Sequence, residues 1–86
     1  MLDLRRLSLL REVHRRGTLH AVARALSYSP STISQQLSLL EREAGVTLLE
    51  RTGRRVQLTP QAELLVAGAS QLLDDMERLE ASLVPS

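Results

Sequence analysis

Residues 18–42 of the chain read TLHAVARALSYSPSTISQQLSLLER, a pattern typical of two short helices joined by a tight polar turn. Thr18 has the side chain of an N-cap for the first of these helices, and residues 27–28 supply the turn. Ser29 can cap the second helix, with Pro30 at its first helical position, where a missing N–H costs nothing. The stretch therefore predicts a helix-turn-helix.

Apolar residues recur at helical spacing on one face of each of three predicted helices, which indicates a shared core. These faces are Leu4, Leu7, Leu10 and Val13 in a first helix over residues 2–16, then Leu19, Val22, Ala23 and Leu26, then Ile33, Leu37, Leu40 and Ala44. Asp3 and Gly17 are cap signals for the first helix, and Gly45 ends the third. Tyr28, the only aromatic residue, is expected to fill the gap between the second and third helices.

The start of the third helix is rich in small hydroxyl and amide side chains. Ser31, Ser34 and Gln35 would let this helix approach base edges in a DNA major groove closely while they donate and accept hydrogen bonds. Ordinary surface polarity is the alternative, and it applies best to Gln36.

Residues 46–58, VTLLERTGRRVQL, change character and predict a short hairpin. Its tip contains one glycine, and Arg51, Arg54 and Arg55 cluster around it. Such a hairpin fits a wing that touches a phosphate backbone or a minor groove; a solvated arginine-rich turn is the alternative.

Thr59 and Pro60 begin a last helix with a cap and an N1 proline. Apolar residues then alternate at spacings of three and four, as in a coiled-coil seam, from Ala62 to Leu83. The seam is too long for its own small domain to cover, so we expect a homodimer formed with the same helix of a second chain. The expected interface is Leu65, Ala69, Leu72, Met76, Leu79 and Leu83. The alternative is that the stripe packs back over the first three helices.

The charge is divided unevenly along the chain, although the net charge is only +1. Residues 1–58 carry +5 and residues 59–86 carry −4, so only the first part is suited to meet a polyanion. For the arginines of the first helix, Arg11 among them, and for the acidic run at residues 74–77, a solvated face is expected.

Several classes of protein are disfavoured by what the sequence lacks. Without cysteine there is no disulfide and no thiolate metal site, and His14 and His20 have no neighbouring ligands, so neither a metal nor a cofactor is expected. No nucleophile–base pair or phosphate-binding glycine loop is present, so we expect no catalytic residues and no enzyme. Without a long apolar run or a signal peptide, no membrane contact and a cytoplasmic location are expected.

The order and spacing of several short motifs resemble the N-terminal DNA-binding domain of LysR-type transcriptional regulators over essentially the whole chain. The motifs are Leu4-x-x-Leu7, Gly17-Thr18, Ala25-Leu26-x-x-Ser29, Ile33-Ser34-x-Gln36-Leu37-x-x-Leu40-Glu41, Gly45-Val46-x-Leu48, Glu50-Arg51 and Arg55-x-x-Leu58-Thr59-Pro60. A helical interaction module without DNA function is the competing hypothesis, supported by the heptad seam and the near-neutral net charge. The charge asymmetry and the arginine-rich hairpin count against it.

The resemblance implies an all-α dominated fold: a winged helix-turn-helix over residues 1–58, with three helices and a two-stranded wing, followed by a linker helix for dimerisation over residues 59–86. The helix over residues 30–42 would lie in the major groove, and the dimer would bind an inverted-repeat operator in double-stranded DNA. In the family a small-molecule effector binds a C-terminal domain. That domain is absent from this chain, which we therefore expect to be a fragment of a bacterial regulator.

Carried over to this sequence, the family pattern implies two sets of DNA contacts. Base readout would come from Pro30, Ser31, Thr32, Ser34 and Gln35, and backbone or wing contacts from Thr18, Gln36, Arg51, Arg54 and Arg55. The family often has arginine where this chain has Gln35, and an amide pairs best with adenine. We therefore expect base preferences different from those of commoner members.

Overall fold

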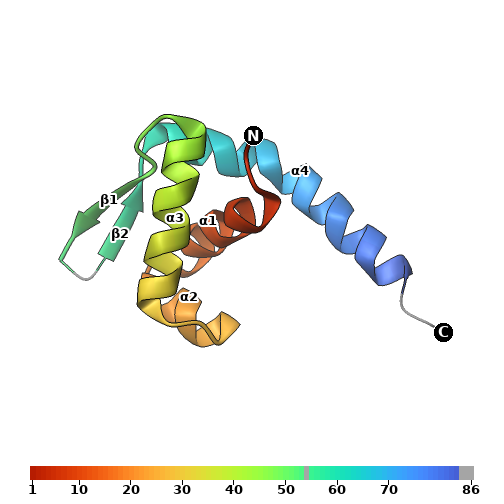
Figure 1. Cartoon of the computed structure of the whole chain (residues 1–86), viewed down its shortest axis with the longest axis horizontal. Helices are drawn as coiled ribbons and strands as arrows, with labels where there is room; N and C mark the ends of the chain where they lie inside the picture. The colour runs from red at the N-terminus through yellow and green to blue at the C-terminus, as the bar shows by residue number, and fades with distance from the viewer. Residues whose placement is uncertain (54, 84–86) are drawn as a thin grey trace.

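The computed structural model describes residues 1–53 and 55–83, which form four helices and one two-stranded sheet (Figure 1). In chain order the elements are α1 (Leu4–Arg16), α2 (Leu19–Leu26), α3 (Pro30–Ala44), β1 (Leu49–Thr52), β2 (Arg55–Leu58) and α4 (Pro60–Ser82). The predicted fold class, a winged helix-turn-helix followed by a long last helix, is confirmed.

The helix boundaries follow from local capping, as predicted. Each N-cap side chain accepts a hydrogen bond from a backbone N–H of the first turn: Asp3 from Arg5, Thr18 from Ala21, Ser29 from Thr32, and Thr59 from Ala62. Gly17 and Gly45 end α1 and α3 in the left-handed region, at φ 84° and 73°. Ser27 ends α2 in the same region, at φ 61°, although it has a Cβ.

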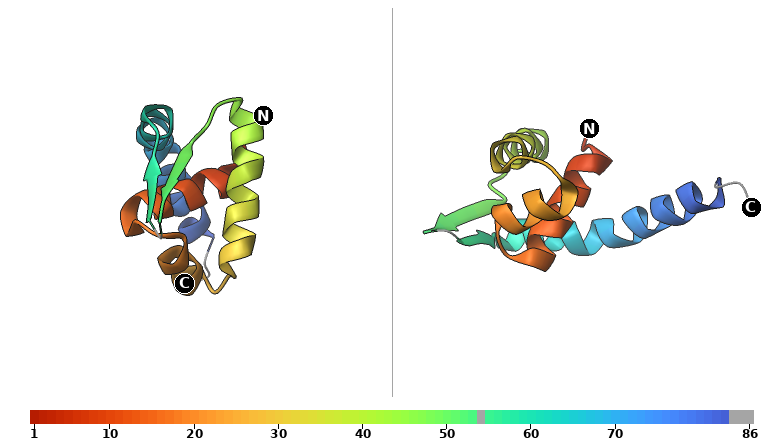
Figure 2. Two further views of the ribbon diagram at one scale, coloured as in Figure 1. Left: turned by 90° about the vertical axis from the view of Figure 1, so that its left-hand side faces the viewer. Right: turned by 90° about the horizontal axis from the view of Figure 1, so that it is seen from below.

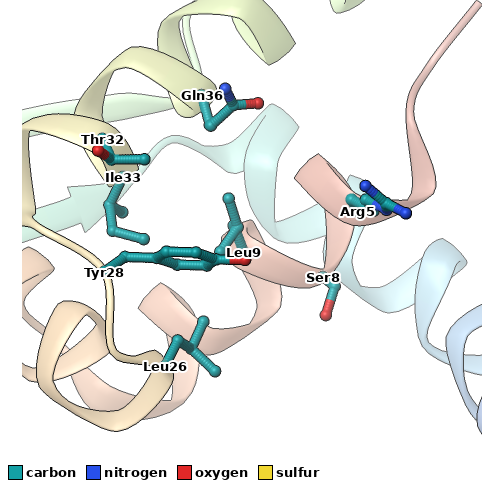
Figure 3. Close-up of a pocket in the computed structure, with 8 residues that line it drawn as sticks. All are labelled: Arg5, Ser8, Leu9, Leu26, Tyr28, Thr32, Ile33 and Gln36. Carbon is teal, nitrogen blue, oxygen red and sulfur yellow. The ribbon is translucent and has the colours of Figure 1, made fainter.

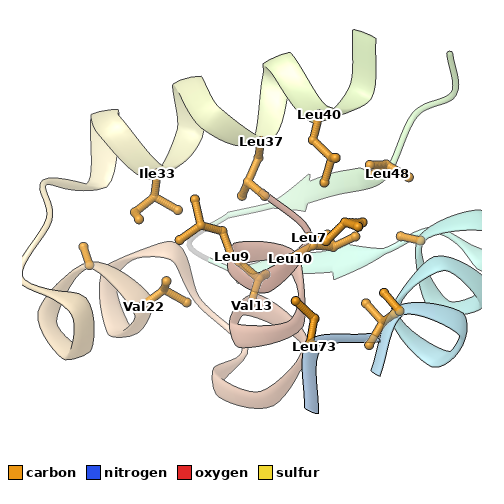
Figure 4. Packing of buried hydrophobic residues seen from close by; sticks show 14 residues of the cluster. Leu7, Leu9, Leu10, Val13, Val22, Ile33, Leu37, Leu40, Leu48 and Leu73 are labelled. Atoms are coloured by element: carbon orange, nitrogen blue, oxygen red, sulfur yellow. The ribbon is translucent and has the colours of Figure 1, made fainter. Parts of the chain in front are cut away.

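The core lies where α1, α2 and α3 meet, and Leu48 and α4 close it (Figure 4). Leu10, Val22, Ile33 and Leu40 are wholly buried in it. Leu9 is also buried, whereas Leu4 and Leu26, both predicted to face inward, lie at the rim. The difference arises because α1 is enclosed on several sides, so its buried face is wider than one stripe.

The carboxylate of Glu41 connects the last part of α3 to the start of the wing. Glu41 Oε2 accepts hydrogen bonds from the backbone N–H groups of Leu48, at 2.7 Å, and Leu49, at 3.3 Å. The strands then pair antiparallel from Leu49 opposite Leu58 to Thr52 opposite Arg55. Because these bonds start at the end of α3, they fix where the wing leaves the body of the protein.

The stripe of α4 that was predicted to form a dimer seam is divided between two surfaces. Ala62, Val66, Ala69 and Leu73 are buried in the core of the protomer, and α4 contacts α1. Ala69 was expected at the dimer interface, and this was wrong, because it is only 4% exposed within the protomer. The apolar stripe is wider than a two-position seam, so one side is covered internally. Leu72, Leu79 and Leu83 remain exposed, Met76 is half-buried, and Leu65 is half-buried against the core.

Arg11 joins α1 to α4, contrary to the expectation of a solvated side chain. Its side chain is only 4% exposed and forms ion pairs with Asp74, at 3.0 Å, and with Glu77. Both carboxylates are more than half exposed, so they keep contact with water while they neutralise the buried guanidinium. The acidic run of α4 is therefore in part a clamp on α1.

Candidate nucleic-acid interface

The face of α3 opposite the core is polar and open to solvent. Ser31 and Gln35 are exposed and Ser34 is half-buried, whereas Ile33 and Leu37 point into the core. Residues 31, 34 and 35 share one face because they are separated by three and four positions. The structure thus brings together three of the predicted base-reading residues on one accessible surface.

The first turn of α3 adds a cluster of hydroxyl groups to this face. Ser29 Oγ lies 3.1 Å from Ser31 Oγ and 2.8 Å from Thr32 Oγ1, and it accepts the N–H of Thr32 at 3.2 Å. Pro30, at the first helical position, is exposed beside them. The free N–H groups of a helix start favour negative charge, so this end of α3 is suited to a polyanion.

A groove of about 500 Å³ lies between α2, the start of α3 and the wing. Basic side chains from two elements line it, His20 from α2 and Arg51 and Arg55 from the wing, together with Pro30 and apolar residues. From the sequence, His20 was excluded as a metal ligand and was given no DNA contact. The position of His20 beside the wing depends on the tertiary fold, because no local sequence signal connects α2 with the hairpin.

Thr18 lies at the N-terminus of α2, next to this groove. Its Oγ1 accepts the N–H of Ala21 at 3.0 Å, and the side chain is half-buried. The hydroxyl proton is left free to donate to an anion, and the helix start attracts one. The predicted backbone contact of Thr18 is compatible with this geometry.

The wing brings its arginines to both sides of the hairpin. Arg51 and Arg55 are exposed, and Arg51 donates a hydrogen bond to Ser34 Oγ of α3. Arg54, the third arginine of the predicted wing contact, lies outside the described residues. Figure 2 shows the wing and α4 extending from opposite ends of the molecule, so the wing extends the surface of α3 rather than that of α4.

Gln36 turns away from the groove, towards α1. Its Oε1 accepts a hydrogen bond from Arg6 Nε at 3.0 Å, and Arg6 also pairs with Glu43 at 2.6 Å. Only the amide NH₂ of Gln36 is left for another partner, so a backbone contact through this residue would have to use that group.

Tyr28 lies over a hollow between α1, the turn and α3, near Leu9 and Leu26 (Figure 3). Tyr28 is 54% exposed and lies between Leu26 of α2 and Ile33 of α3, so it only partly fills the gap that it was expected to fill.

The described residues contain no cluster of three or more potential metal ligands. No helix within residues 1–53 and 55–83 combines the length and apolar character needed to cross a membrane.

Four helices, a two-stranded wing and an open polar face on the second helix of the helix-turn-helix define a winged helix-turn-helix protein. Residues 4–63 match the family model of bacterial regulatory helix-turn-helix proteins, lysR family. The chain belongs to the LysR family, as its sequence motifs indicate.

The relatives are similar over this same region. The chain is 39% identical over 67 residues to the HTH-type transcriptional regulator DmlR of Escherichia coli K12, which covers 78% of this chain and 22% of DmlR. The structure of this chain is similar to that of the CbnR DNA-binding domain in a complex with DNA. The TM-score is 0.85, the sequence identity is 30%, and the match covers 94% of this chain and 93% of the CbnR chain. For the complex of the BenM DNA-binding domain with catB site 1 DNA, the TM-score is 0.83, the identity 29% and the coverage 93% and 86%. The chain spans about 22% of the length of the first curated relatives that it matches.

Proposed function

We propose that this chain is the DNA-binding part of a cytoplasmic bacterial transcriptional regulator and binds a specific double-stranded operator, with α3 in the major groove. The observation that carries the proposal is the polar stripe of Ser31, Ser34 and Gln35, in which Ser31 and Gln35 are exposed and Ser34 is half-buried, bordered by the basic groove between α2 and the wing. The stripe supplies groups that read base edges, and the arginines supply contacts to phosphates. The similarity to two domains solved with DNA supports this assignment.

Specific binding is tested by selecting bound sequences from a random duplex pool at physiological salt. We expect enrichment of one motif and an affinity that falls steeply with salt, because arginines release counterions from the phosphates that they contact. Ser34→Ala combined with Gln35→Ala should reduce the preference for this motif over random DNA and leave non-specific binding almost unchanged. Gln61→Ala, which removes an exposed amide from the first turn of α4, is the matched control. Equal loss of specific and non-specific binding in the double variant would argue against base readout.

We also propose that two copies associate through α4 and bind an inverted repeat. The support is the exposed apolar stripe of Leu72, Leu79 and Leu83. It borders a mainly apolar groove of about 590 Å³ that the N-terminal residues and α1 form with Leu72, Met76 and Leu79. A second copy of the same helix would cover this apolar surface.

Sedimentation of charge-inserting variants tests the dimer. Leu72→Asp should give monomers, because a carboxylate would be buried in the apolar contact. Ala67→Asp adds the same charge to an exposed position of α4 beside Arg15 and should leave the dimer intact. If Leu72→Asp remains dimeric, the copies associate through another surface. If the dimer forms but no DNA motif is enriched, a helical interaction module would account for the chain better than a regulator.

The whole protein would then regulate transcription in response to a small molecule bound outside residues 1–86. Residues 1–58 would act as the DNA-binding unit and residues 59–86 as the linker. The two units have one common core, because Ala62 and Val66 of the linker are buried in the same cluster as residues of α1, α2 and α3.

A further inference from the structure

A hydrogen bond joins the wing to the recognition face of α3. Arg51 of β1 donates to Ser34 Oγ, across 17 positions of sequence. Sequence analysis assigned these residues to separate tasks, base readout for Ser34 and phosphate contact for Arg51. The structure makes them neighbours, so the chemistry of one affects the other.

Arg51 brings to this face a charge that α3 lacks. Residues 30–41, the first three turns of α3, contain no arginine, lysine or histidine. Arg6 also reaches α3, but it contacts Gln36 on the side next to α1. The cation beside Ser34 therefore comes from the wing.

The hydrogen bond determines how Ser34 can interact with a base. A serine hydroxyl has one proton to donate and two lone pairs, and a guanidinium can only donate. Once Arg51 occupies a lone pair, the hydroxyl proton is directed to a further acceptor, and the adjacent positive charge favours acceptors over donors. Guanine presents two adjacent acceptors in the major groove, N7 and O6, and no donor, whereas adenine and cytosine present an amino donor and thymine presents a single acceptor, O4, beside its methyl group.

We propose that Arg51 and Ser34 together form a reader of guanine, in which Arg51 is a specificity-determining residue and not only a phosphate contact. The proposal rests on the proposed function. It restores to this face a cationic guanine contact that the neutral Gln35 cannot make. Gln35 would favour adenine at its own position, so the two preferences are separable.

The test is sequence selection with the full chain carrying Arg51→Met, Ser34→Ala or both substitutions. Each single variant should lose about tenfold in preference for guanine at one and the same position, and the preference at other positions should persist. The double variant should lose no more than either single variant, because both remove the same contact. Circular dichroism checks that each variant is folded, as expected for changes at a half-buried serine and an exposed arginine.

Arg55→Met is the matched control, because Arg55 is exposed on the other strand of the wing and has no hydrogen bond to α3 among the described residues. It should lower the affinity for all sequences and leave the base preferences unchanged. A second measurement replaces the selected guanine with 7-deazaguanine, which lacks the N7 acceptor. This change should weaken binding by the unsubstituted chain and have little effect on Ser34→Ala or Arg51→Met.

The results separate failure of the paired reader from failure of specific DNA binding. If Arg51→Met behaves like Arg55→Met, or affects a different base position from Ser34→Ala, the paired reader is wrong while specific DNA binding stands. The same conclusion follows if the selected position is not guanine. If the unsubstituted chain enriches no motif, both the proposed function and the paired reader are overturned.

Discussion

The clamp between Arg11 and the two carboxylates of α4 predicts an asymmetric response to mutation. Arg11→Met replaces a buried guanidinium by an apolar side chain about as long as the aliphatic part of arginine and leaves Asp74 and Glu77 in contact with water. Replacing a buried ion pair by well-packed apolar groups is often close to neutral. We therefore expect the free energy of unfolding to change by less than about 1 kcal/mol.

The reverse change should be far more damaging. Asp74→Ala with Glu77→Ala leaves the guanidinium of Arg11, 4% exposed, without a counter-charge. Breaking a fully buried pair costs about 3–5 kcal/mol, and exposure of the carboxylates reduces this to about 2–3 kcal/mol, because water can enter where they lay. For a domain of this size that is a fall in Tm of roughly 10–20 °C. Adding Arg11→Met to the double variant should restore most of the loss.

Thermal and urea unfolding followed by far-ultraviolet circular dichroism measure these differences. The protomer concentration must be held constant, because dimerisation contributes to apparent stability. Asp75→Ala with Glu80→Ala, two exposed acids of the same helix, is the matched control and should change stability little. The reasoning is refuted if the variant without Asp74 and Glu77 is as stable as this control, or if Arg11→Met does not rescue it.

Three further predictions concern single residues, each measured by urea unfolding. Leu10→Ala, at a fully buried position, should lower the free energy of unfolding by about 2–5 kcal/mol; a loss below 1 kcal/mol would mean that the core is looser than described. Glu41→Ala removes the acceptor of the Leu48 and Leu49 N–H groups and should cost about 1–3 kcal/mol, with faster amide hydrogen exchange at those two residues and no change expected in α2. Ser27→Gly relieves a left-handed conformation and should stabilise by about 0.5–1 kcal/mol, whereas a destabilised variant would contradict the assigned φ of 61°.

The helices and their ends were predictable because their signals are local. Thr18, Ser29 and Thr59 each cap a helix from within three residues, and their hydroxyls accept the expected N–H groups. The rotation of α4 about its axis was not predictable from its pattern. Its apolar stripe is broad enough to serve two surfaces, and which side meets α1 depends on tertiary packing.

The contacts that sequence reasoning missed are all non-local. Arg11 and Asp74 are 63 positions apart, and nothing near either residue indicates a partner. The pairing of Arg51 with Ser34 likewise depends on where the hairpin returns beside α3. Arg11 and Arg51 have long side chains that could reach several partners, and only the tertiary arrangement of the backbone determines which partner each one meets.

The α4 helix is held to the rest of the protein along most of its length. Its 23 residues correspond to about 34 Å of helix, its buried residues extend to Leu73, and the ion pairs of Arg11 reach Glu77. A change of about 5° in the angle between the whole of α4 and α1 would displace the far end of α4 by about 3 Å. Substitutions in the contact between α4 and α1, far from any base-reading residue, should therefore alter the half-site spacing that a dimer accepts while each protomer keeps its preference for the half-site sequence.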